Sequence, residues 1–306
     1  MHKKYISFFS LLIILAFIGY IIYDTSSDSN ITEEELQSDG PVIPDQWILT
    51  SEVFSDDGDL TSLATGMNGI TYLGGDSYIS SYDVDQKKVW SVKTSGRITS
   101  LTVYGDTIFG STNDLILLLS PDGKLIDEWG PFEDNSIITS LATNRNYLVF
   151  ADAGNKMVFV LTKDGRVKSM FGQSGEKFII PSPYFDVEID EKNTLFIANT
   201  GHRRVETRNI DGDLISFFGS PGTAPGAFCG CCNPAHFTGV PGGFVTAEKG
   251  LNRIKIVDEK GEFVEYVSAN NNFTASIPLD IASPDGKTIY AANPDDSKLY
   301  VFKRRP

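Results

Sequence analysis

Short apolar segments alternate with polar turns along most of the chain, and this alternation repeats at long intervals. Each repeat contains an apolar strand, a polar turn that ends in glycine, and a second apolar strand. Four such repeats lie at residues 116–130, 158–172, 205–219 and 254–268. Their turn glycines are Gly123, Gly165, Gly212 and Gly261, which are 42, 47 and 49 residues apart. This spacing is typical of the blades of a β-propeller.

Two further short β-rich segments precede each hairpin, so each unit is predicted to be a four-stranded antiparallel meander. An earlier unit fits at 60–93, and the last, at 277–303, has three strands. We expect Trp47–Phe54 to supply the missing strand, which closes the ring and removes exposed sheet edges. The sequence therefore predicts an all-β fold, a six-bladed β-propeller over residues 47–306. The alternatives are a β-sandwich, which rarely repeats at this interval, and a β-helix, whose rungs are shorter.

The N-terminal segment departs from this pattern. Ile6–Tyr23 is an uncharged apolar run of 18 residues, and a membrane-spanning helix needs about 17 to 25. A cleavable signal peptide is the alternative, but its apolar core is usually about 7 to 15 residues long and ends at small residues. We therefore expect an N-terminal transmembrane helix that acts as a signal anchor. Lys3 and Lys4 precede the run and acidic residues follow it, so the N-terminus is expected in the cytoplasm.

This topology divides the chain into a cytoplasmic tail (1–5), a transmembrane anchor (6–23), an acidic linker (24–46) and the propeller (47–306). The propeller is then extracytoplasmic, either periplasmic or extracellular, on a single-pass membrane protein. The formal net charge is −14, from 40 acidic and 26 basic side chains. Because such a surface repels phosphate groups, nucleic acid is not expected as a partner.

Residues 196–205 read Phe-Ile-Ala-Asn-Thr-Gly-His-Arg-Arg-Val, and Asp211-Gly212 and Phe218-Gly219 follow. This succession resembles the repeat of the NHL family, whose core is Asp-x-x-Asn-His-Arg-Val, and residues 151–158 carry a weaker form of it. The resemblance covers residues 140–270 well and the remainder loosely. It implies the propeller fold more than a function, because propellers of this kind include binding scaffolds, lyases, lactonases and sensor domains.

All three cysteines of the chain, Cys229, Cys231 and Cys232, lie within four positions. His202 and His236 are the two histidines of the predicted ectodomain. The cysteines belong to the connection between the fourth and fifth blades, and His202 to the loop between the second and third strands of the fourth. Both segments are expected on the same face of the disc. These five side chains are candidate ligands of copper or zinc, because both ions favour sulfur and imidazole.

Two other interpretations of the cysteines stay open. Cys229 and Cys232 have the spacing of a Cys-x-x-Cys redox pair or a structural disulfide, which an exported compartment permits. Alternatively, the cysteines are small buried residues that pack a loop.

Four basic residues are expected on the same rim, namely Arg203, Arg204, Lys249 and Arg253. They are candidates for an anion-binding site. The alternative is that they join one blade to the next by hydrogen bonds.

Three classes of function follow from these observations. The first is a membrane-tethered extracytoplasmic module for binding or assembly, with a protein partner and a Cys/His metal or redox site. The second is a propeller-type enzyme, a lyase or hydrolase with a site in the central funnel. It is less favoured because His202, Asn199 and Asp152 make a thin catalytic set and no nucleophile with its base is recognisable. The third is a purely structural scaffold.

Overall fold

The computed structural model describes residues 46–305 except for 67, 68, 174, 176, 231, 270–272 and 274–276. The predicted tail and anchor, and all of the predicted linker except Gln46, lie outside the described residues. Within the part of the chain that is described, no helix has both the length and the apolar character needed to cross a membrane.

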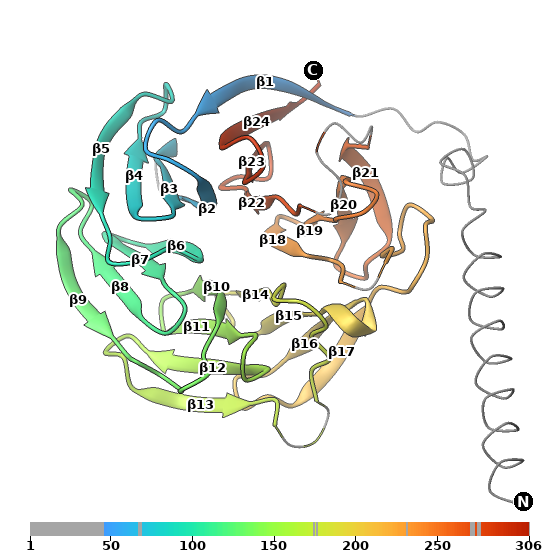
Figure 1. Cartoon of the computed structure of the whole chain (residues 1–306). Coiled ribbons are helices and arrows are strands. Elements are labelled where there is room, and N and C mark those ends of the chain that lie inside the picture. The colour runs from blue at the N-terminus through green and yellow to red at the C-terminus, as the bar shows by residue number, and fades with distance from the viewer. Residues whose placement is uncertain are drawn as a thin grey trace, which may run out of the picture. The chain divides into compact units, whose positions relative to one another are not determined.

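Six four-stranded antiparallel sheets surround a central axis, as the six-bladed propeller prediction requires (Figure 1). In blades one and two, the strands from the axis outward are β2 (Leu60–Thr65), β3 (Thr71–Gly75), β4 (Tyr78–Tyr82) and β5 (Lys88–Lys93), then β6 (Ser100–Tyr104), β7 (Thr107–Ser111), β8 (Ile116–Leu119) and β9 (Leu125–Trp129). In blades three and four they are β10 (Ile138–Thr143), β11 (Tyr147–Asp152), β12 (Met157–Thr162) and β13 (Val167–Phe171), then β14 (Val187–Ile189), β15 (Leu195–Asn199), β16 (Arg204–Arg208) and β17 (Leu214–Phe218). In blades five and six they are β18 (His236–Val240), β19 (Gly243–Ala247), β20 (Ile254–Asp258) and β21 (Phe263–Ser268), then β22 (Asp280–Ala282), β23 (Thr288–Asn293), β24 (Lys298–Arg304) and β1 (Trp47–Phe54).

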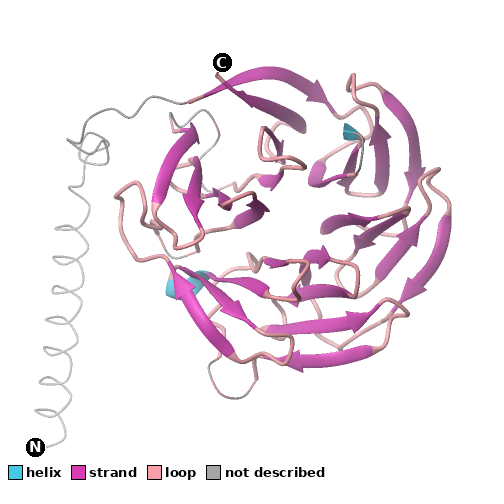
Figure 2. Ribbon diagram, turned by 180° about the vertical axis from the view of Figure 1, so that it is seen from behind, coloured by secondary structure: helices cyan, strands magenta, loops and turns pink. Residues whose placement is uncertain are grey.

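The predicted closure of the ring is confirmed. β1 pairs with β24 in antiparallel register, from Trp47 opposite Arg304 to Phe54 opposite Lys298. The indole Nε1 of Trp47 also donates a hydrogen bond to Glu265 of blade five at 3.2 Å. The first described strand therefore completes the last blade and contacts its neighbour. Figure 2 shows the closed ring from behind.

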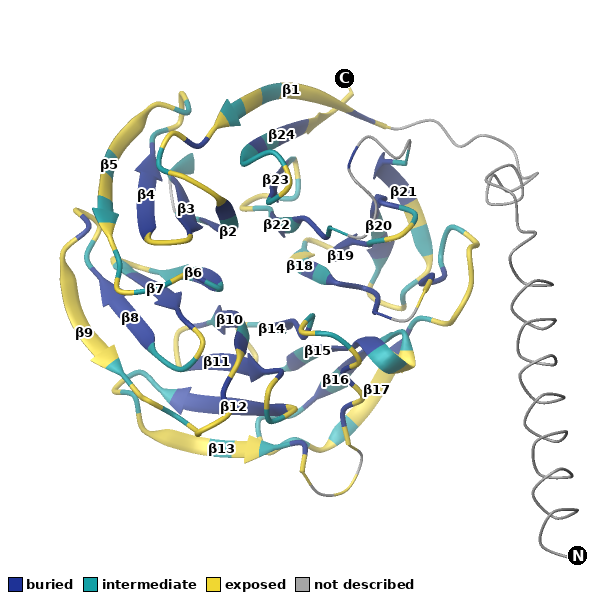
Figure 3. Ribbon diagram, viewed as in Figure 1, coloured by how far each residue is buried: buried dark blue, intermediate teal, exposed yellow. Residues whose placement is uncertain are grey.

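The core lies between the blades, because the middle strands are buried on both faces while the outer strands are half exposed (Figure 3). The repeated turn glycines contribute to this packing. Each has φ between 80° and 93° and lies against an aromatic ring on the outer strand of the preceding blade. The pairs are Gly123 with Trp90, Gly165 with Trp129, Gly212 with Phe171, and Gly261 with Phe218. Glycine is needed both for its positive φ and because a Cβ would meet the ring.

Candidate functional site

The cysteine segment lies in the connection between β17 and β18, and Cys229 is buried there. Its backbone N–H donates to Glu248 Oε2 at 3.4 Å, and its thiol donates to the carbonyl of Lys249 at 3.7 Å. Ile137 and Ile179 make the equivalent backbone bonds in the two preceding blades, to Asp152 at 2.9 Å and to Asn199 at 3.0 Å. Cys229 thus occupies a structural position of the repeat. The connection thereby contacts the loop that follows the second strand of blade five.

The five predicted metal ligands are distributed over different parts of the fold. Cys229 forms no disulfide in the structure, Cys232 is buried, and Cys231 lies outside the described residues. His202 ends the short 3-10 helix η2 (Thr200–His202), whereas His236 opens the innermost strand β18. Among the residues that are described, no group of three His, Cys, Asp or Glu side chains is arranged to hold a metal ion. Metal binding by the set with Cys231 stays a prediction.

Arg204, Lys249 and Arg253 of the rim make internal side-chain contacts. Arg204 donates to Glu206 at 2.6 Å, and Arg253 donates to Glu248 at 2.8 Å. The ammonium group of Lys249 lies 4.4 Å from the centre of the Tyr184 ring, and Arg203 adopts a positive φ of 54°. Two of the three guanidinium groups are therefore already paired with buried carboxylates.

A different cluster of chemical groups lies on the innermost strands. Thr-Ser-Leu opens the first strand of blades one, two and three, at residues 61–63, 99–101 and 139–141. In blades four, five and six, the position of that serine is taken by Asp186, His236 and Asp280. Half of the ring is therefore neutral, and the other half carries two carboxylates and an imidazole.

At four of the six junctions, the side chain at this ring position accepts a hydrogen bond from the backbone of the next blade. The backbone N–H of Leu141 donates to Ser100 at 3.0 Å, and that of Val187 donates to Ser140 at 3.1 Å. The N–H of Phe237 donates to Asp186 at 2.7 Å, and that of Leu63 donates to Asp280 at 2.8 Å. These hydrogen bonds fix the orientation of the Asp186 and Asp280 side chains. They therefore also fix the position of the other oxygen of each carboxylate.

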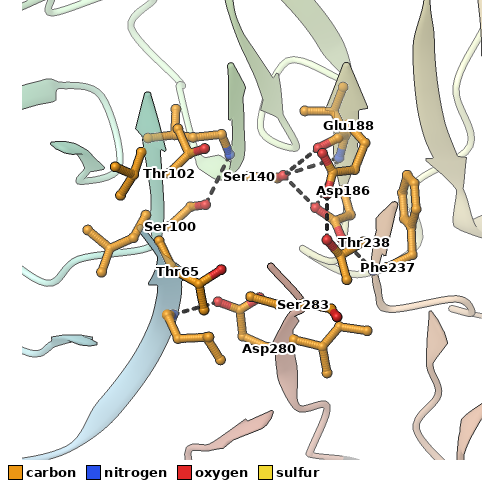
Figure 4. A pocket seen from close by; sticks show the side chains of 18 residues that line it. Thr65, Ser100, Thr102, Ser140, Asp186, Glu188, Phe237, Thr238, Asp280 and Ser283 are labelled. Atoms are coloured by element: carbon orange, nitrogen blue, oxygen red, sulfur yellow. Dashed lines mark hydrogen bonds between the residues drawn. The ribbon is translucent and has the colours of Figure 1, made fainter. Parts of the chain in front are cut away.

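His236 lies between the two aspartates. Its Nδ1 is 3.7 Å from Asp186 Oδ2 and 3.7 Å from Asp280 Oδ1. Glu188, two residues beyond Asp186 on β14, accepts a hydrogen bond from Thr238 at 2.9 Å. Figure 4 shows the three carboxylates, which come from blades four and six. The imidazole of His236, from blade five, lies near two of them.

Burial makes the ionised forms of these carboxylates costly. Desolvation raises the pKa of Glu188 to about 7, and the charge of Asp186 adds to this effect. Desolvation also raises the pKa of Asp280 to about 6, although the charge of His236 acts in the opposite direction. The pKa of Asp186 is likewise raised by burial, against the influence of His236 and of a hydrogen bond from Ser140. The cluster is short of positive charge.

A cavity of about 160 Å³ adjoins the cluster and is lined by Asp186, Glu188 and Asp280. The described residues that line it include no lysine or arginine. Figure 4 shows Thr65, Ser100 and Thr102 of blades one and two across this cavity from Asp186 and Glu188, whereas Ser140 of blade three lies beside Asp186 and donates a hydrogen bond to it. The arrangement can bind a cation or exchange protons with a small molecule, since strongly perturbed pKa values in a cavity are typical of functional sites.

Asp186, Glu188 and Asp280 were not predicted as site residues from the sequence. His236 was predicted as a metal ligand together with the cysteines. The missing signal was the alignment of the innermost strands. Once the three Thr-Ser-Leu segments are aligned with Phe185-Asp186-Val187 and Leu279-Asp280-Ile281, the two aspartates replace a repeated serine.

No family model matches the chain, and no curated protein is similar to it in sequence. Solved structures share its fold. Virginiamycin B lyase from Staphylococcus aureus is 15% identical, with a TM-score of 0.60 over 85% of this chain and 100% of the lyase. A catalytically inactive variant of that lyase, solved with quinupristin, gives a TM-score of 0.61 at the same identity and coverage. The WD40 domain of Neurospora crassa Pan2 is 10% identical, with a TM-score of 0.58 over 87% of this chain and 98% of that domain. At these identities the likeness establishes the propeller fold alone.

Proposed function

We propose that this protein is a membrane-tethered, extracytoplasmic binding module whose central channel receives the positively charged group of a ligand. The observation that carries the proposal is the set of three carboxylates, Asp186, Glu188 and Asp280, around one cavity, with the imidazole of His236 near two of them. A buried carboxylate without enough positive charge is destabilised, and a bound cation removes that cost.

The raised pKa values add a thermodynamic signature. A cation favours the ionised carboxylates, so its binding lowers the pKa of Glu188 from about 7 and that of Asp280 from about 6. Binding near pH 6 must therefore release protons, and affinity must rise as the pH increases through this range.

Calorimetric titration of the full-length chain with methylammonium tests this proposal. We expect binding that weakens about tenfold in Asp280→Asn and in Glu188→Gln, because each removes one negative charge from the cavity. Asp122→Asn is the matched control, since Asp122 lies in an exposed outer turn and pairs with exposed Lys124. A parallel titration with calcium distinguishes an organic cation from a metal ion. Methylammonium affinity that is absent, or equal in all variants, would refute the organic-cation proposal.

A second candidate is the acid–base enzyme, a lyase or hydrolase. The specific observation in its favour is that two carboxylates flank Nδ1 of His236, an arrangement that can orient an imidazole and stabilise its protonated form. The fold likeness to virginiamycin B lyase is consistent with it. Turnover of a panel of lactones, esters and quinupristin, abolished in His236→Gln and retained in His202→Gln, would establish this function.

We also propose that the cysteine segment binds copper or zinc, or undergoes thiol redox chemistry. Its support is the clustering of Cys229, Cys231 and Cys232. Metal analysis of anaerobically purified protein, compared with a variant in which all three are serine, tests this. Equal metal content and equal thiol reactivity in both proteins would remove the site.

The NHL-type repeat and the membrane anchor complete the proposal. Four blades place a non-glycine residue with positive φ at the same position of the loop before their third strand, namely Lys156, Arg203, Asn252 and Ser297. This regularity supports an NHL-like repeat. Membrane fractionation of the full-length chain and of a chain without residues 1–23 tests the anchor: we expect the first in the membrane and the second released from it.

A further inference from the structure

A second, wider cavity lies beside the channel cavity, which is the cavity lined by Asp186, Glu188 and Asp280. It has a volume of about 870 Å³ and is formed by the loops that follow the innermost strands of blades one, two and six. Thr65 and Val103 line both cavities, and Ser283 of the first is followed directly by Pro284 of the second. The two spaces are therefore adjacent, at the ends of the same strands.

The short segment from Asp280 to Pro284 limits the distance between the two cavities. Asp280 opens β22, and Pro284, four residues later, lines the wider cavity. At about 3.3 Å per residue, their Cα atoms are at most about 13 Å apart. A molecule about 13 Å long is therefore long enough to reach from Asp280 to Pro284 in the wider cavity.

The wider cavity has a different chemical character from the channel. Tyr104, Tyr290, Val103 and Pro284 give it apolar and aromatic surface, and glycines at three of its lining positions contribute no side chain. The ammonium group of Lys163 lies 4.6 Å from the centre of the Tyr104 ring. It also donates a hydrogen bond to Thr143 at 2.5 Å, so this contact helps to hold the ring in place.

We infer that the wider cavity receives the apolar or aromatic body of the ligand whose cationic end enters the channel, so that the ligand is an organic ammonium ion with an apolar tail. This inference rests on the proposed binding function and adds its ligand class. The charge of the wider cavity also suits a cationic ligand. Its described lining residues include one acidic side chain, Asp285, and no basic one. The apolar body adds affinity through the surface it buries.

Calorimetric titrations of the full-length chain with methylammonium, 4-phenylbutylammonium and the neutral 4-phenylbutanol test the inference. We expect 4-phenylbutylammonium to bind at least about tenfold more tightly than methylammonium. Thr288→Trp fills part of the wider cavity and does not belong to the lining of the channel cavity, so it should abolish this gain and leave methylammonium binding unchanged. Pro284→Trp, also in the wider cavity alone, should do the same and serves as a second variant if Thr288→Trp fails to fold. Val167→Trp, on an exposed position of outer strand β13, is the matched control and should keep the gain.

The outcomes separate the two proposals. If methylammonium binds and weakens in Asp280→Asn, but the phenylbutyl group adds nothing, the inference is wrong and the proposed function stands. The same holds if folded Thr288→Trp and Pro284→Trp both keep the gain. If 4-phenylbutanol binds as tightly as the ammonium compound, the wider cavity acts independently of the channel and the inference is again wrong. If neither ammonium compound binds, the proposed function fails.

Discussion

The carboxylate of Asp280 accepts a hydrogen bond from the backbone N–H of Leu63 at 2.8 Å, although the two residues are 217 positions apart. This bond joins the innermost strand of the last blade to that of the first. It also directs the carboxylate toward the axis, where its other oxygen lies 3.7 Å from His236. The same interaction therefore closes the ring and orients a group of the candidate site.

Replacing Glu188 with glutamine should make stability less dependent on pH. Because burial raises the pKa of Glu188 from 4.5 to about 7, the folded protein holds this proton more tightly than the unfolded chain. Its stabilising contribution is complete below pH 4.5 and is lost as the pH rises through 7. The loss amounts to at most about 3 kcal/mol. Urea unfolding of the wild type and Glu188→Gln between pH 4.5 and 7.5 measures it, and an equally steep decline in both would contradict the assignment.

Removal of the His236 ring should raise the pKa of Asp280 above its present value of about 6. The charge of His236 is the largest influence that opposes desolvation at this carboxyl. Phenylalanine keeps the approximate volume of the ring and removes its charge. Carbon NMR titration of the aspartate carboxyls in His236→Phe measures the change, with His202→Phe as the control that should leave Asp280 unaffected. A lower pKa in His236→Phe would show that the imidazole does not stabilise the carboxylate.

Glu248→Gln should destabilise blade five strongly. Glu248, Arg253 and Lys255 are all buried, and the carboxylate lies 2.8 Å from Arg253 and 3.0 Å from Lys255. Loss of the negative charge leaves two buried cations without their partner, which typically costs about 3 to 5 kcal/mol. Urea unfolding provides the measurement. The exposed pair of Asp122 with Lys124 is the comparison, since Asp122→Asn should leave stability nearly unchanged. Similar effects of the two substitutions would argue against the buried network.

Two glycines of blade five should respond differently to alanine. A Cβ at Gly243 would lie 2.0 Å from the carbonyl oxygen of Val257, whereas a Cβ at Gly239 meets no atom within 4 Å. Gly243→Ala should therefore cost about 2 kcal/mol or more, because the neighbouring backbone must move. Gly239→Ala should change stability by less than about 0.5 kcal/mol. Thermal unfolding of both variants tests the close approach of β19 and β20, and equal melting temperatures would show that it is absent.

The repeat architecture was accessible from the sequence because it depends on local patterns. Alternating apolar residues, glycine turns and the unpaired segment Trp47–Phe54 predicted the blades and the strand that closes the ring, and both predictions are confirmed. The candidate site could not be predicted from such local patterns. Cys229, Cys231 and Cys232 stand out in the sequence because they are rare and close together, whereas Asp186 and Asp280 are common residues in separate repeats.

The six-bladed fold follows from the sequence, since strands and turns depend on side chains that are neighbours along the chain. The chemistry at the axis depends on contacts between distant parts of the chain. Only closure of the ring brings His236 between two carboxylates that lie 50 positions before it and 44 after it. Only burial there raises the pKa values of Glu188 and Asp280. Desolvation and charge proximity depend on distances in space, and those distances are set by the packing of the blades.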